Sequence, residues 1–168
     1  MKSNLLMAGM VGMALLVGTA DGFAAANWVV NDADKPNKNV ERNYYDAQSV
    51  KVRKKTLSWT EKTVLTDFGV KYYARHLTQY PVCQKNMAEK GEVAYHQIDL
   101  QIRNGKFRTI AKRNYNKADE LLCTDKDMGN EFDKSWQDIV YGSPIYERHY
   151  LFVTKYKLGD DFSRAGKR

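Results

Sequence analysis

The chain has 168 residues, and its 27 Lys and Arg outnumber its 20 Asp and Glu to give a net charge of +7. Hydrophobic residues make up 43% of the chain and aromatic residues 12%, which is typical of a domain with a core and excludes a disordered chain. The positive charge favours acidic partners, such as anionic lipids, cell-wall polymers, glycosaminoglycans or acidic proteins.

Residues 1–26 have the pattern of a cleaved signal peptide. Lys2 precedes an uncharged run from Leu5 to Ala20, and Ala24-Ala25-Ala26 supplies the small residues that a signal peptidase recognises. A transmembrane anchor is the competing interpretation, but the run is shorter than the roughly 20 apolar residues that a span needs. We therefore expect an exported protein, periplasmic or secreted, which could associate with the cell surface without a lipid anchor. Export also argues against nucleic acid as the partner.

The rest of the chain is predicted to be one domain, residues 27–159, followed by a flexible tail, residues 160–168. Asn27 to Val30 is a first strand, and Asn31 to Asn43 is a loop by composition. Tyr44 to Asp46 then leads into a strand over Ser49 to Val52. A basic turn, Arg53-Lys54-Lys55, joins that strand to another over Thr56 to Leu65. Glu61 falls on the apolar side, so this strand either ends early or gives Glu61 a partner.

The middle of the chain contains the strongest hairpin signal. Tyr72 to Gln79 is ambiguous between strand and helix, whereas Cys83 to Lys90 is helix-like and Gly91 ends it. Asn104-Gly105 predicts a type I′ turn, because both central positions of that turn need a positive φ. The expected register puts three pairs on an apolar face, namely Ile102/Phe107, Leu100/Thr109 and Ile98/Ala111. The opposite face then pairs Arg103 with Lys106, Gln101 with Arg108, and Gln97 with Lys112.

The last third of the chain adds a strand over Glu120 to Thr124, a turn over Asp125 to Gly129, a segment from Phe132 to Ile139 and a helix. Ser143 is a good helix N-cap, and Pro144 is favoured at the first helical position. One helical stripe contains Ile145, His149, Phe152, Val153 and Tyr156, and Gly159 supplies a stop. The predicted fold class is α+β, a mostly antiparallel sheet with a C-terminal helix packed on one face.

Two cysteines, Cys83 and Cys123, are expected to form a disulfide, because an even pair in an oxidising compartment is typically bridged. A redox or metal-binding pair is the alternative, but it lacks the Cys-x-x-Cys spacing or a neighbouring His.

No catalytic, cofactor or metal site is predicted. His76, His96 and His149 are far apart, without the spacing of metal ligands. The chain also has no nucleophile elbow and no phosphate-binding glycine loop. We therefore expect a non-enzyme without a cofactor. An enzyme without a recognisable motif would need a pocket that gathers His76, His96 and a carboxylate.

The remaining feature is a cluster of basic residues at the two hairpins. One interpretation is a solvated outer face that keeps the protein soluble. The other is a docking surface for a polyanion or an acidic protein, in which Arg makes bidentate contacts. The candidate residues are Arg53, Lys54 and Lys55 on the first hairpin, and Arg103, Lys106, Arg108, Lys112 and Arg113 on the second.

Several segments resemble the surface-adhesin protein E family of exported bacterial proteins. They are Trp28-Val29-Val30, the stretch from Tyr44 to Val50, Trp59, Trp136 to Ile139, Gly142-Ser143-Pro144 and Glu147. The resemblance implies one small α+β domain that binds extracellular-matrix proteins of a host, and it allows a homodimer. The chain departs from the adhesins of that family because it has no lipobox Cys. The alternative function is a periplasmic inhibitor or assembly factor that binds one exported protein.

Overall fold

The computed structural model describes residues 26–31, 36–129 and 133–158. The predicted signal peptide up to residue 25, Gly159 and the predicted tail lie outside the described residues. The strands are β1 (Trp28–Val30), β2 (Val40–Asp46), β3 (Lys51–Arg53), β4 (Thr56–Leu65), β5 (Val93–Arg103), β6 (Lys106–Asn116), β7 (Leu121–Thr124) and β8 (Gln137–Asp138). The helices are α1 (Asp67–Leu77), α2 (Pro81–Lys90) and α3 (Pro144–Lys155).

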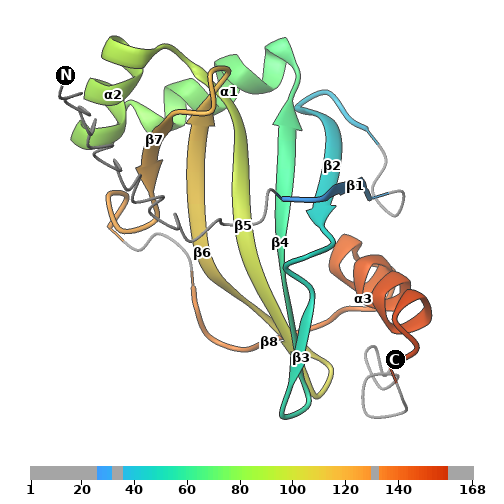
Figure 1. Cartoon of the computed structure of the whole chain (residues 1–168). Helices are drawn as coiled ribbons and strands as arrows, with labels where there is room; N and C mark the ends of the chain where they lie inside the picture. Colours follow the sequence, from blue (N-terminus) through green and yellow to red (C-terminus); the bar gives the residue numbers. More distant parts are fainter. Residues whose placement is uncertain (1–25, 32–35, 130–132, 159–168) are drawn as a thin grey trace, which may run out of the picture.

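These strands form one antiparallel sheet in the order β1-β2-β4-β5-β6-β7, with β3 beside β4 and β8 beside β6. Figure 1 shows α1 and α2 at the upper end of the sheet, and β3 and β8 at its lower end near α3. The predicted α+β class, with a mostly antiparallel sheet and a C-terminal helix, is confirmed.

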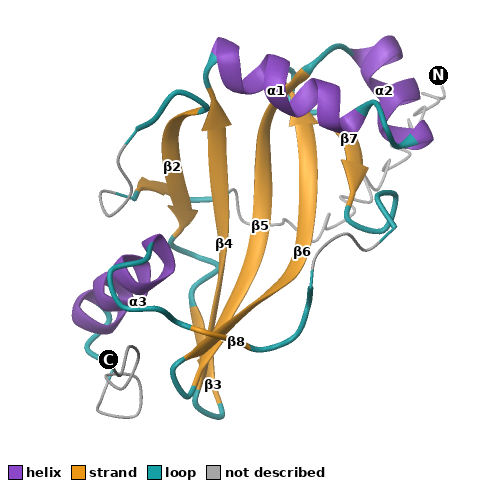
Figure 2. Cartoon of the chain, turned by 180° about the vertical axis from the view of Figure 1, so that it is seen from behind, coloured by secondary structure: helices purple, strands orange, loops and turns teal. Residues whose placement is uncertain are grey.

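The three described helices pack on the same face of the sheet, and alternate residues of β4 are buried beneath them. Trp59 contacts Phe152 of α3 at 4.8 Å between ring centroids, in the lower core. Leu65 packs with Leu77 of α1 and Cys83 of α2 in the upper core. The opposite face carries polar residues such as Thr60, and no described helix packs on it. Figure 1 views the sheet from this side, with α1 behind the strands, and Figure 2 views it from the side of the helices. We call these the covered face and the open face.

The helix ends have the signals that the sequence supplies. Ser143 caps α3, since its Oγ accepts a hydrogen bond from the Tyr146 amide at 3.3 Å, and Pro144 starts the helix. The ambiguous segment from Tyr72 to Gln79 belongs to α1 as far as Leu77, and Thr66 caps that helix through the Gly69 amide. The predicted disulfide between Cys83 and Cys123 is confirmed, and it ties α2 to β7.

Two strand predictions are wrong at their boundaries. The sequence between Asn31 and Asn43 was expected to be a loop, but β2 begins at Val40. Pairing with β4 accounts for this, because Val40 lies opposite Leu65 and Asn43 lies opposite Thr63, with the two polar side chains hydrogen-bonded at 2.7 Å. The strand predicted from Ser49 is confined to Lys51–Arg53, because only these residues pair with β4.

The predicted hairpin is confirmed near its turn and wrong further along. Ile102 lies opposite Phe107, and Leu100 opposite Thr109, as expected. A β-bulge at Ile110 then shifts the register by one residue, so that Ile98 lies opposite Lys112 and Gln97 opposite Arg113. A shift of one residue turns side chains to the other face. Lys112 is consequently on the covered face and only 7% exposed.

Candidate binding surface

The tips of two hairpins enclose a groove of about 590 Å³ on the open face. We call it the basic groove, and its lining residues are Arg53, Lys54, Thr56, Ser58, Gln101, Arg103, Arg108 and Trp136. Four of the eight predicted basic residues therefore lie around one depression.

The two turns bring these cations together because β4 pairs with β5. Leu57 lies opposite Ile102, which places the β3–β4 turn beside the β5–β6 turn. Lys54 and Lys55 have φ of 46° and 60° in the first turn, and Asn104 has φ of 52° in the second. Both turns therefore use the left-handed conformation that tight hairpins need.

Trp136 forms one wall of the groove and orients its arginines. The guanidinium of Arg108 lies 4.5 Å from the centre of the Trp136 ring, and that of Arg103 lies 5.1 Å from it. Gln101 Oε1 accepts hydrogen bonds from Nε and Nη2 of Arg108, at 3.0 and 2.8 Å. Stacking and hydrogen bonding leave the positive charge of Arg108 intact, so the groove holds oriented cations without neutralising them.

The groove is unbalanced in charge. No carboxylate is among its lining residues, and in the described part of the chain Arg53, Lys54, Arg103 and Arg108 form no ion pair. Lys106 is different, because its Nζ lies 3.2 Å from Asp138 Oδ1 across the β6–β8 pairing. Four positive charges around one depression attract anions. A bound anion would also reduce the repulsion among the four side chains.

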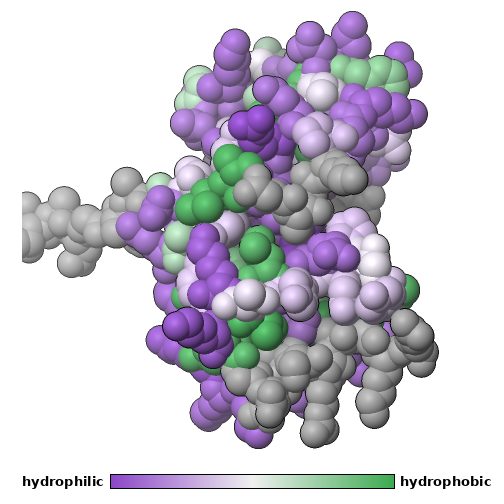
Figure 3. Space-filling model, turned by 90° about the vertical axis from the view of Figure 1, so that its right-hand side faces the viewer, coloured by the Kyte–Doolittle hydropathy of each residue, from purple (hydrophilic) through white to green (hydrophobic). Residues whose placement is uncertain are grey.

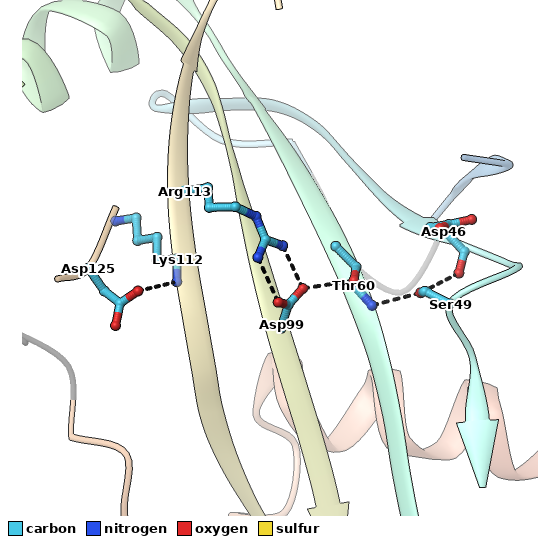
Figure 4. A network of polar contacts seen from close by, with 7 residues as sticks. All are labelled: Asp46, Ser49, Thr60, Asp99, Lys112, Arg113 and Asp125. Atoms are coloured by element: carbon cyan, nitrogen blue, oxygen red, sulfur yellow. Dashed lines mark hydrogen bonds and ion pairs between the residues drawn. The ribbon is translucent and has the colours of Figure 1, made fainter. Parts of the chain in front are cut away.

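The other predicted basic residues lie elsewhere. Lys55 belongs to the β3–β4 turn but does not line the groove. The prediction that Lys112 shares the basic face is wrong. The bulge at Ile110 turns its side chain to the covered face, where it is buried. Figure 4 shows the side chains of Lys112 and Arg113 leaving β6 in different directions.

Arg113 lies on the open face, but a carboxylate already holds it. Its Nη1 and Nη2 donate to Asp99 at 2.7 and 2.6 Å, and these hydrogen bonds raise the pKa of Arg113. Asp99 also accepts from Thr60 Oγ1, and the Thr60 amide donates to Ser49 Oγ, so a polar chain crosses the sheet (Figure 4). Arg113 therefore braces the sheet instead of presenting a free charge.

The histidines do not assemble into one site. His96 lies on the covered face beside a cavity that Glu61 also lines. The ring of His76 instead meets the ring of Tyr80 edge to face, with 5.7 Å between centroids, and His76 does not line that cavity. Among the described residues, no group of His, Cys, Asp and Glu could hold a metal ion. None of the described helices has the length and apolar character needed to cross a membrane.

Sequence reasoning missed the residues that complete the groove, namely Thr56, Ser58, Gln101 and Trp136. Gln101 could have been found, because the predicted register already pairs it with Arg108. Trp136 carries no such signal, since it lies 28 residues beyond Arg108 in the sequence and reaches the groove only through the β6–β8 pairing.

Comparison of the chain with protein-family models, with curated proteins and with solved structures finds no match.

Proposed function

We propose that this chain is an exported, non-enzymatic binding protein that docks an acidic partner in the basic groove. The observation that supports the proposal is the set of four cations around one groove with no carboxylate among its lining residues. Arginine matches carboxylates, sulfates and phosphates with paired hydrogen bonds, and Trp136 offers an aromatic contact of the kind enriched at interfaces. The resemblance to surface-adhesin protein E favours extracellular-matrix proteins or other polyanions of a host as the partner.

The disulfide is consistent with export, because such bridges persist in oxidising compartments. Export is part of the proposal, and sequencing the amino terminus of the protein recovered from its producing cell would test it. A mature chain that begins near Asn27 is the expected result.

The groove is tested with the double variant Arg103→Glu/Arg108→Glu. Heparin is a suitable first probe, since it is a polyanion that requires no knowledge of the natural partner. We expect the variant to elute from immobilised heparin at clearly lower salt than the unchanged protein. Salt weakens the interaction because the screening length falls from about 10 Å at 0.1 M to about 3 Å at 1 M.

The matched control is Lys117→Glu/Lys126→Glu, which changes the net charge equally at two exposed positions that do not line the groove. If both variants lose the same retention, net charge alone explains binding and the groove has no special role.

A second function is a periplasmic inhibitor or assembly factor with one protein partner. Exposed hydrophobic side chains just before and on α3 favour it, since Val140, Tyr141 and Tyr150 are 67%, 59% and 62% exposed. Figure 3 views the molecule from the side of α3 and shows hydrophobic residues gathered in its middle and lower part. A partner captured equally at low and high salt, and lost in Tyr141→Ser/Tyr150→Ser, would support this function over the first.

A further inference from the structure

A second cavity lies on the covered face of the sheet. It is located between α3, which packs on the lower core, and α1 and α2, which pack on the upper core. Its volume is about 600 Å³, within the range of about 300–1,000 Å³ typical of small-molecule sites. β4 and β5 supply Glu61, Thr63 and His96, α1 supplies Tyr73, and α3 supplies Ile145 and Arg148.

The cavity exists because the hydrophobic core is divided. The lower cluster under α3 includes Trp59 and Leu100, while the upper cluster under α1 and α2 includes Leu65 and Val93. Between Trp59 and Leu65, the inward positions of β4 are Glu61 and Thr63, which are polar. Both residues are buried from bulk solvent, and both line the cavity, which leaves space for a small occupant beside them.

Most polar groups on the floor of the cavity are satisfied within the protein. Glu61 accepts a hydrogen bond from Trp59 Nε1 at 2.8 Å and forms an ion pair with Arg148 at 3.2 Å. Thr63 Oγ1 donates to Asn43 at 2.7 Å. The charges of Glu61 and Arg148 therefore offset each other, and the floor does not select for an ion. Glu147 also lines the cavity, but it is exposed to solvent.

His96 is the exception. It is 5% exposed, it lines the cavity, and its Nδ1 is buried without a hydrogen-bond partner. Its ring packs against Tyr73 at 5.4 Å. A buried polar atom that lacks a partner costs about 1–3 kcal/mol, so a ligand that supplied the missing hydrogen bond would be favoured.

The protonation state of His96 restricts the kind of ligand. Burial lowers its pKa to about 3, with contributions from the positive charges of Lys112 and Arg148, so the ring is neutral at physiological pH. A neutral imidazole offers one donor and one acceptor and attracts no anion. Around it, Ile98, Leu100 and Phe107 give the cavity hydrophobic walls.

We propose that this cavity binds a neutral small molecule with a hydrophobic ring or chain and one hydroxyl group, which hydrogen-bonds to the imidazole of His96. The site goes beyond the proposed function, because it lies on the opposite face of the sheet from the basic groove and uses none of its residues.

Titration of the purified protein with phenol, followed by NMR, tests the proposal, with toluene as the probe that lacks the hydroxyl. We expect saturable phenol-dependent shifts at the methyl groups of Ile98 and Leu100 and at the His96 ring. His96→Phe keeps an aromatic ring but removes the hydrogen bond, so phenol should bind it about tenfold more weakly. Toluene should bind the variant and the unchanged protein equally.

Thr109→Trp places a large ring in the cavity and should abolish the shifts, provided that the variant keeps its folded spectrum. If it does not fold, intermolecular NOEs between phenol and the Leu100 methyl groups decide the location. The proposal is overturned if phenol causes no saturable shifts, if NOEs to Leu100 are absent, or if His96→Phe binds phenol as tightly as the unchanged protein. Heparin retention is unaffected by any of these outcomes, so failure here is distinguishable from failure of the proposed function.

Discussion

At the scale of single residues, the covered face is notable for the charges that it buries. Glu61 is on the inward side of β4 with its side chain 4% exposed, and Arg148 reaches it from α3 with 18% exposure. An ion desolvated to this degree is tolerated only when a partner offsets the loss of hydration. The pair therefore links α3 to the middle of the sheet by charge as well as by packing.

Replacing Arg148 with Met should lower the free energy of unfolding by about 3 kcal/mol, because it leaves the Glu61 carboxylate buried without that partner. Urea unfolding monitored by circular dichroism measures the effect. The double variant Glu61→Gln/Arg148→Met should be more stable than Arg148→Met alone, since the buried carboxylate that lost its ion pair with Arg148 is replaced by a neutral amide. Equal stability of the two variants would mean that Glu61 does not depend on Arg148.

His96 makes stability depend on pH. In the unfolded chain a His takes up its proton near pH 6.5, whereas the folded protein protonates His96 only near pH 3, because of burial and the charges of Lys112 and Arg148. Between these values the unfolded state binds more protons, so acid favours unfolding by up to about 1.4 kcal/mol per pH unit. This stabilisation is complete above pH 6.5 and is lost as the pH falls.

The comparison of the unchanged protein with His96→Phe isolates this contribution, since the two proteins differ at this residue alone. We expect the free energy of unfolding to fall more steeply between pH 6.5 and pH 4 in the unchanged protein. Parallel curves would show that His96 becomes protonated in the fold without difficulty.

At the scale of elements, the first turn of α1 is fixed by a close approach to the chain before β2. Thr66 Oγ1 donates to the Lys38 carbonyl at 2.5 Å and accepts from the Gly69 amide. A Cβ built at Gly69 would lie 2.0 Å from the carbonyl oxygen of Asn39, so the backbone leaves no space for a side chain.

Gly69→Ala should therefore destabilise the protein by about 1–3 kcal/mol, as overpacking does. The direction of the change in stability is informative, because Gly→Ala within an ordinary helix stabilises the helix by up to about 1 kcal/mol. Gln84→Ala at an exposed position of α2 is the control and should have little effect. Thermal unfolding of the three proteins measures the difference, and a stabilised Gly69→Ala variant would contradict the contact with Asn39.

The bulge in β6 shows how one residue changes the chemistry of an element. Without Ile110 as the extra residue, Lys112 would join Arg108 on the open face, as simple alternation predicts. With it, Arg113 takes the open face and meets Asp99, while Lys112 lies inside with its ammonium 5.3 Å from the ring centre of Tyr73. Bulges of this kind commonly redirect side chains without ending a strand.

At the scale of the whole molecule, the disulfide and the two candidate sites lie in different parts of the fold. The disulfide joins α2 to β7 at the upper end of the sheet, whereas the turns that carry the basic groove are at the lower end (Figure 1). The cavity of His96 lies between the upper and lower cores.

Cys83→Ser/Cys123→Ser should lower the free energy of unfolding by about 4 kcal/mol, from the entropy of the unfolded chain that a bridge spanning 40 residues removes. Heparin retention of the folded variant should be unchanged, because the groove is built without α2 and β7. Calorimetry and the heparin column, run on the same sample, measure both quantities. Loss of retention in a folded variant would contradict this separation.

The sequence by itself determined the features that depend on neighbouring residues. Alternation predicted β4, Asn104-Gly105 predicted the β5–β6 turn, Ser143-Pro144 predicted the start of α3, and the cysteine pair predicted the disulfide. Alternation also placed Arg103 and Arg108 on one face of the β5–β6 hairpin, and composition placed Arg53 and Lys54 in the β3–β4 turn, because all four are within a few residues of the two turns.

Tertiary structure decided the rest, because distant segments had to meet. The bulge that buries Lys112, the β2 strand before Tyr44 and the ion pair of Glu61 each depend on partners that local sequence does not identify. Trp136 joins the groove only through the pairing of β8 with β6, and His96 lines a cavity only because α1 and α3 leave a gap between two cores. Side-chain direction follows from strand periodicity, but proximity follows from how the sheet and helices pack.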